Sequence, residues 1–165
     1  MGSELQPHKY PWLVYLKIRD SWCGGSIIGR RTILTAGHCV YKPRDPIYDF
    51  EVRVYVGVHN VARGLNSPLK VKEIVVHPKY EKRFDYDIAI LKLASDIPYS
   101  ETAAPICIPE NDEENFKDLI IAGWGATDID NRPAVPSVVD VEYIARKLTS
   151  VLVGRNSSGH FVGIL

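Results

Sequence analysis

The stretch Cys23–Val40, with the sequence CGGSIIGRRTILTAGHCV, decides the fold. It holds two short apolar and β-branched runs, Ser26–Ile28 and Thr32–Leu34, and the Gly29-Arg30-Arg31 segment between them favours a turn. This pattern is typical of two neighbouring antiparallel strands. The two cysteines flank the strands, which favours a Cys23–Cys39 bridge. Closing a loop of about 15 residues stabilises a fold by roughly 3 kcal/mol in an oxidising compartment.

Further runs of strand length lie on both sides of this stretch. They are Trp12–Ile18, Glu51–Val58, Lys70–Val76 and Asp87–Leu93. The segments between them are rich in Gly, Pro, Asn and Asp, which interrupt a ladder and keep strands short and antiparallel. Together with the first two, these runs fit a small barrel. The sequence therefore predicts an all-β fold whose first part, residues 3–109, is a complete antiparallel β-barrel.

The composition changes after Pro109. Residues 110–118 hold five acids in nine positions, and we interpret them as an exposed acidic linker. Leu119–Gly125 then has the character of a buried strand, and Val139–Tyr143 alternates apolar and polar residues with period two. A second sheet therefore begins after the linker.

The sequence pattern near the end of the chain does not predict further strands of this second sheet. Gly154–His160 is turn-like, and only five residues follow it. We expect residues 119–165 to form a partial second barrel with a divergent tail.

Composition excludes several classes of partner. The 165 residues carry 20 Lys and Arg against 20 Asp and Glu, so the formal net charge is zero. No run gathers many positive residues, which argues against nucleic acid as a partner. No stretch approaches the roughly 18 consecutive apolar residues of a membrane span, so we expect no membrane partner. The first residues, Met1–Pro11, lack the apolar segment of a secretory signal.

Three motifs stand in register over about 100 residues. They are the Cys23–Val40 stretch, YDIAILKL at Tyr86–Leu93 and GWG at Gly123–Gly125. In order and spacing they resemble the motifs of trypsin-like serine proteases of the chymotrypsin family, and the resemblance covers nearly the whole chain. It implies a trypsin-like β-barrel, hydrolysis of internal peptide bonds, and polypeptide substrates or inhibitors as partners. It implies no cofactor.

In this family a serine oxygen attacks the peptide carbonyl, a histidine takes its proton, and an aspartate orients the imidazole. The resemblance makes His38 the base and Asp87 the orienting residue. Asp85 lies two residues earlier, but Asp87 heads the apolar Asp-Ile-Ala-Ile-Leu run and is preferred. The remaining histidines are expected to be surface residues. They are His8, His59, His77 and His160.

The chain also departs from the family pattern. No Gly-Asp-Ser-Gly-Gly segment exists to supply the nucleophile, and the nearest candidate, Ser157-Ser158-Gly159, lacks the preceding aspartate and the second glycine. The family's Ile-Val-Gly-Gly-like start is missing as well, since Met1 and Gly2 stand where its last two glycines would be. We therefore expect a truncated chain that is inactive alone. The alternatives are a non-catalytic protease homologue that binds a protein partner, and a chain without function.

Other residues have weaker assignments. Cys107 has no partner, and it is either a buried free thiol or the site of an intermolecular bridge. Asn156 begins an Asn-Ser-Ser pattern and is a glycosylation candidate. A metal site at Cys23, His38 and Cys39 is disfavoured, because adjacent His and Cys side chains do not readily face one ion and a fourth ligand is missing. The bridge and the family together imply secretion.

Overall fold

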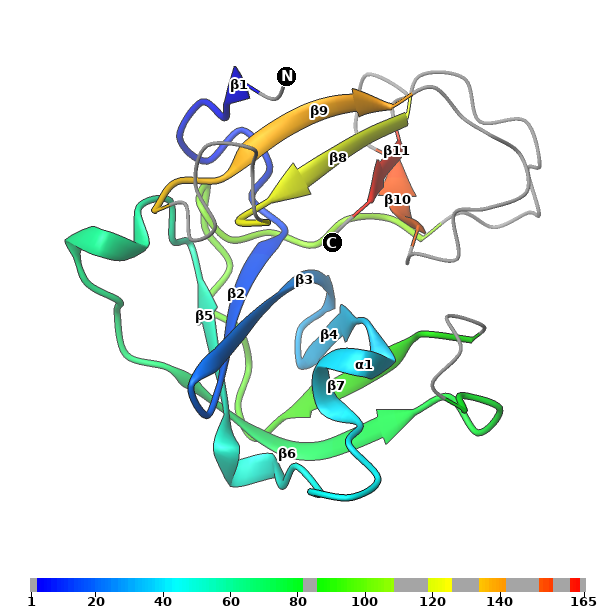
Figure 1. Cartoon of the computed structure of the whole chain (residues 1–165). Coiled ribbons are helices and arrows are strands. Elements are labelled where there is room, and N and C mark those ends of the chain that lie inside the picture. The colour runs from blue at the N-terminus through cyan, green and yellow to red at the C-terminus, as the bar shows by residue number, and fades with distance from the viewer. Residues whose placement is uncertain are drawn as a thin grey trace.

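The computed structural model describes residues 3–81, 86–108, 119–125, 134–141, 152–155 and 161–163. Six strands close into an antiparallel barrel in the order β2-β3-β4-β7-β6-β5 (Figure 1). Their bounds are β2 Leu13–Ile18, β3 Ser21–Gly29, β4 Thr32–Thr35, β5 Val52–Val56, β6 Leu69–Val76 and β7 Ala89–Leu93. The predictions of an all-β fold and of an antiparallel barrel are confirmed.

Period-two alternation builds the barrel core. In β2, Val14 and Leu16 are fully buried, whereas Lys17 between Leu16 and Ile18 is exposed. The facing strands contribute further fully buried side chains. These include Ile27, Ile33, Val54, Leu91 and Leu93. Burial of each such aliphatic side chain contributes about 1.5–3 kcal/mol, so the alternating pattern accounts for the closed barrel.

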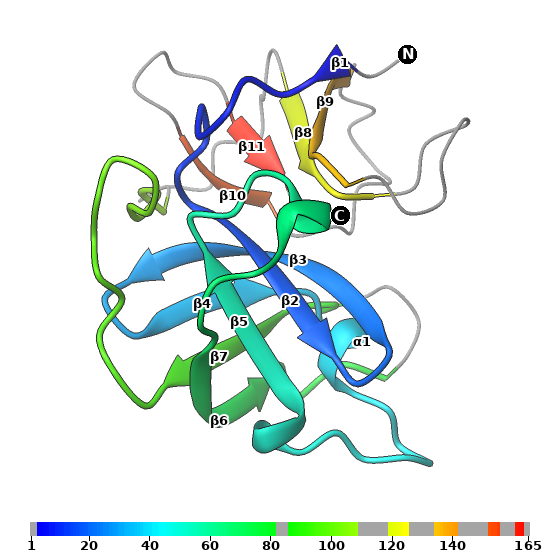
Figure 2. The same ribbon diagram turned by 90° about the vertical axis from the view of Figure 1, so that its left-hand side faces the viewer.

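Strand β3 is longer than the sequence predicts. It begins at Ser21, because its first half pairs with β2 in the register Leu16↔Cys23 and Ile18↔Ser21. The glycines and polar residues of this half do not form an apolar run, and only the partner strand shows that it is extended. Figure 2 shows β2 beside β5 on the face of the barrel turned to the viewer.

The remaining strands form a second sheet in the order β1-β9-β8-β11-β10. Their bounds are β1 Ser3–Glu4, β8 Leu119–Gly123, β9 Ser137–Val141, β10 Leu152–Arg155 and β11 Phe161–Gly163. The expectation that the end of the chain does not extend the second sheet is wrong, because β10 and β11 pair with each other and β11 pairs with β8. Strand β11 runs parallel to β8. Two-residue apolar segments such as Leu152-Val153 and Phe161-Val162 are too short to show a strand pattern in the sequence. Their extended conformation depends on the distant strands with which they pair.

Short helices complete the fold. They are α1 Gly37–Val40 and the 3₁₀ turns η1 Asp49–Glu51 and η2 Val61–Arg63. Among the residues that the structure describes, no helix has the length and apolar character needed to cross a membrane. The acidic segment 110–118 lies outside the described residues.

Trp124 joins the second sheet to the barrel. Its indole is 3% exposed and donates a hydrogen bond of 3.1 Å to the carbonyl of His59. Its own carbonyl accepts a bond of 3.3 Å from the indole of Trp22 in β3. The ring meets Tyr15 of β2 edge-on at 5.5 Å between centroids. The GWG motif therefore packs against the outside of the barrel.

Candidate active site

Pairing between β4 and β7 places the two candidate residues together. Thr35, the last residue of β4, lies opposite Ala89, the first residue of β7. Helix α1 starts two residues after Thr35, and Asp87 comes two residues before Ala89. His38 and Asp87 therefore lie at the same edge of the barrel. The Thr35 hydroxyl also donates a 2.8 Å hydrogen bond to the carbonyl of Gly24, which ties this edge to β3.

Asp87 contacts His38 at two points. Its Oδ2 atom lies 2.6 Å from Nδ1 of the ring, and its Oδ1 atom accepts a 2.7 Å hydrogen bond from the backbone N–H of His38. When the carboxylate is ionised and the ring is neutral, this contact requires the proton to be on Nδ1 and leaves a lone pair on Nε2, because an ionised carboxylate only accepts hydrogen bonds. The Asp87 side chain is 8% exposed, whereas that of His38 is 58% exposed. The anchored imidazole therefore presents a proton acceptor to solvent.

Tyr80 lies near the carboxylate of Asp87. A Cβ atom placed on Gly37 would lie 3.2 Å from Asp87 Oδ1 and 3.2 Å from the Tyr80 ring, so the three residues meet at one point. Tyr80 is buried and packs edge-on against Tyr41, with 5.6 Å between ring centroids. Burial, and then the charge of Asp87, raises the pKa of Tyr80 above its usual value. The sequence pattern missed Tyr80, because the loop after β6 alone brings it here.

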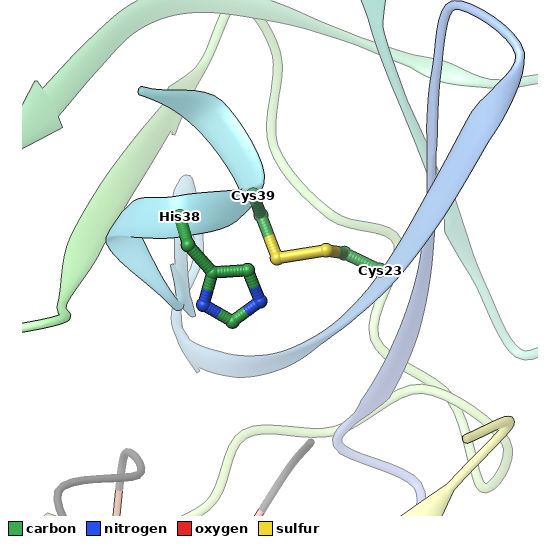
Figure 3. Close-up of side chains that lie close together, drawn as sticks. All are labelled: Cys23, His38 and Cys39. Carbon is green, nitrogen blue, oxygen red and sulfur yellow. A yellow bond between two sulfur atoms is a disulfide. The ribbon is translucent and has the colours of Figure 1, made fainter. Parts of the chain in front are cut away.

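Cys23 and Cys39 form a disulfide beside the imidazole (Figure 3). The bond joins β3 to α1 across 6.2 Å between Cα atoms. The ligand atoms of the two cysteines and His38 lie within 4.8 Å of one another. Zinc binds cysteine as the thiolate, and both sulfurs are already used in the S–S bond. The cluster as folded is therefore a disulfide next to a histidine.

The other histidines differ in exposure. His8 is exposed, as expected for a surface residue. His59 is only partly exposed: its side chain is 15% exposed, and its Nε2 atom lies 3.6 Å from a carboxylate oxygen of Glu4. His77 is half-buried and stacks on Tyr86 at 4.7 Å. His160 lies outside the described residues.

Cys107 is a free and exposed cysteine. The alternative that its thiol is buried is therefore wrong. Asp85, Asn156 and the Ser157-Ser158-Gly159 segment lie outside the described residues.

Comparisons with known proteins agree with this architecture. A family model described as Trypsin matches residues 1–161. The chain is 35% identical over 133 residues to "Coagulation factor XI" of Bos taurus, which covers 75% of this chain and 21% of that protein. It is 31% identical over 135 residues to "Clotting factor G beta subunit" of Tachypleus tridentatus, which covers 76% of this chain and 43% of that protein. The chain spans less than half the length of these relatives.

Proposed function

This chain belongs to the trypsin family of serine proteases, and we propose that His38 is its general base and Asp87 the residue that orients the base. The contact that carries the proposal is the 2.6 Å approach of Asp87 Oδ2 to Nδ1 of His38. The class of reaction is hydrolysis of internal peptide bonds, with polypeptides as substrates or inhibitors.

Each residue has a distinct chemical role in this proposal. Nε2 of His38 takes the proton of an attacking hydroxyl and then returns it to the leaving amine. Asp87 holds the ring in the tautomer that leaves Nε2 unprotonated, and it stabilises the imidazolium that forms. The low exposure of Asp87 strengthens this attraction, because little water screens the carboxylate.

The nucleophile is the missing part of the site. The 165 residues contain no Gly-Asp-Ser-Gly-Gly segment, and no serine hydroxyl is hydrogen-bonded to His38 in the part of the chain that the structure describes. Removal of the serine from a complete triad lowers turnover by about a millionfold. We therefore propose that these 165 residues alone do not hydrolyse peptides.

Labelling with a fluorophosphonate probe tests this proposal. The probe reacts with an activated serine, so the purified chain is expected to remain unlabelled while an active trypsin-like protease is labelled under the same conditions. Labelling of this chain contradicts the proposed inactivity. In that case the His38→Gln variant shows whether the reactive serine depends on this base, because loss of labelling assigns the reaction to the His38 site.

A second candidate function is a non-catalytic homologue that binds a protein. The observation that favours it is a pair of exposed aromatic side chains, Tyr48 and Phe50, which are 56% and 75% exposed. Isolation of the chain under native conditions tests it, since a stoichiometric protein partner is expected. A monomer without a partner contradicts this alternative.

The disulfide and the family support secretion as the location of the protein. In an oxidising compartment the exposed Cys107 thiol is able to form an intermolecular bridge. Asn156 is proposed as a glycosylation acceptor in the same compartment. Mass spectrometry of the secreted chain, before and after reduction and deglycosylation, tests both modifications.

A further inference from the structure

Three cations lie in a row across the outer surface of the barrel. The register places Lys17 of β2 directly opposite Arg53 of β5, and Arg53 directly opposite Lys70 of β6. All three side chains are exposed. Because directly opposite residues project from the same face of a sheet, Lys17, Arg53 and Lys70 form one surface, which we name the cationic row.

No acid of the described chain is ion-paired with a member of the cationic row. Two nearby cations are paired. Arg19 binds Asp45 and Glu51, and Lys92 of β7 lies 3.0 Å from Glu73. Like charges directly opposite one another destabilise a sheet. A bound anion would reduce this electrostatic repulsion within the cationic row.

A hollow of about 400 Å³ adjoins the cationic row. Its lining includes Lys17 and Arg53, together with Arg19, Asp20, Phe50 and Glu51. The 3₁₀ turn η1 packs against β6 and so brings Phe50 toward the row. The ring of Phe50 stacks on that of Tyr48 with centroids 5.6 Å apart, and it is 75% exposed. Cations without an ion-pair partner and an exposed aromatic side chain therefore lie side by side.

We propose that the cationic row and this hollow bind an extended acidic peptide segment of a partner protein. Lys17 and Lys70, the outer members of the row, are about 10 Å apart at the backbone, because two strand spacings separate them. Alternate residues of an extended peptide are about 7 Å apart, and the long, flexible Lys and Arg side chains can bridge the difference. An intervening apolar residue of the peptide packs against Phe50. This surface is separate from His38 and Asp87 and does not depend on their proposed roles.

The chemistry of the hollow favours a peptide over a sulfated polysaccharide. A polysaccharide has a dense negative charge and no apolar side chains for the stacked rings. The carboxylates of Asp20 and Glu51, which belong to the lining of the hollow, would repel that dense charge, whereas a peptide with spaced acids can avoid them.

Fluorescence anisotropy on the full chain tests the proposal. The probe is a fluorescein-labelled peptide of about ten residues that alternates Glu with Phe, compared with a matched peptide in which Gln replaces Glu. We expect the acidic peptide to bind with an affinity that falls as the salt concentration rises. The Gln peptide is expected to bind less tightly. The Arg53→Gln variant is expected to weaken binding by about two- to fivefold, and Phe50→Ala also lowers affinity.

Arg44→Gln is the matched control, because Arg44 is exposed on the loop between α1 and η1 and is not part of the row. Circular dichroism establishes that each variant keeps the fold. The proposal is overturned if neither peptide binds, if both bind equally, or if Arg44→Gln weakens binding as much as Arg53→Gln. It is also overturned if heparin binds with the same dependence on Arg53 while the acidic peptide does not.

Discussion

Asp87 binds both the backbone and the ring of His38, with one carboxylate oxygen on each. Oδ1 accepts the backbone N–H at 2.7 Å and Oδ2 lies 2.6 Å from Nδ1. The backbone bond fixes the start of α1 and the ring bond fixes the orientation of the imidazole. Residues 49 positions apart are thus held as one unit.

Replacement Asp87→Asn is expected to change the tautomer of His38. The carboxylate accepts from Nδ1–H, whereas the amide group of Asn can donate to Nδ1 and leave the proton on Nε2. Long-range ¹H–¹⁵N correlation spectra of the neutral imidazole measure this directly. Protonation of Nδ1 is expected in the parent chain and of Nε2 in the variant. The same tautomer in both chains would contradict the orienting role.

The Cys23→Ser/Cys39→Ser variant is expected to lose about 3 kcal/mol of unfolding free energy. The disulfide spans a sequence separation of 16, and its loss increases the conformational entropy of the unfolded chain. Urea denaturation measures the difference. Cys107→Ser is the matched control, because this cysteine is exposed and free, and its replacement is expected to leave stability unchanged.

The Arg19–Glu51 ion pair predicts a pH-dependent contribution to stability. Arg19 donates to both oxygens of Glu51, at 2.7 and 2.9 Å, and this contact lowers the pKa of Glu51 below its ordinary value of 4.5. A lowered folded-state pKa stabilises the protein above the unfolded-state value, and the contribution disappears as the pH falls through the folded-state value. Arg19→Gln is therefore expected to lower the melting temperature at neutral pH.

The difference between the parent chain and Arg19→Gln should shrink as the pH falls below about 4.5, since the carboxylate becomes neutral in both. Thermal melts over a pH series provide the measurement. Arg44→Gln, which removes an exposed arginine outside any observed ion pair of the described chain, is expected to show no such convergence. A difference that persists in acid would argue against a charge effect.

Trp124→Ala is expected to destabilise the protein by about 3–5 kcal/mol. The substitution leaves a cavity between the barrel and the second sheet, and the carbonyl of His59 loses its indole donor. Urea denaturation again provides the comparison. Phe50→Ala removes an aromatic ring that is 75% exposed, and its effect is expected to stay within about 0.5 kcal/mol. Equal effects of both substitutions would show that Trp124 does not join the two sheets.

Arg53→Gln is expected to raise the unfolding free energy by about 0.2–1 kcal/mol at low salt. It removes the central charge of the cationic row and so relieves repulsion with Lys17 and Lys70. The gain should fall at high salt, because screening weakens the same repulsion in the parent chain. Denaturation at two ionic strengths measures this dependence, and an unchanged or lower stability at low salt contradicts it.

The barrel was predictable because its signal is local. Alternating runs such as 14–18 and Ala89–Leu93 bury every second residue, and this period is visible in the sequence before any partner is known. The first half of β3 and the strands β10 and β11 were not predictable in this way. Their residues are extended because of the strands they pair with, including the parallel pair of β11 and β8.

The sequence by itself determined the β-class of the fold, the membership in a protease family, and His38 and Asp87 as candidates, since these depend on short-range patterns and motif spacing. Tertiary structure alone decided that Asp87 contacts both the backbone N–H and the Nδ1 atom of His38, that Tyr80 lies near this carboxylate, and that the side chain of His59 is only 15% exposed. It also decided that Lys17, Arg53 and Lys70 form one row in a chain of zero net charge. The physical reason is that strand pairing sets which distant residues meet, and the alternation within one strand does not specify which other strand is its partner.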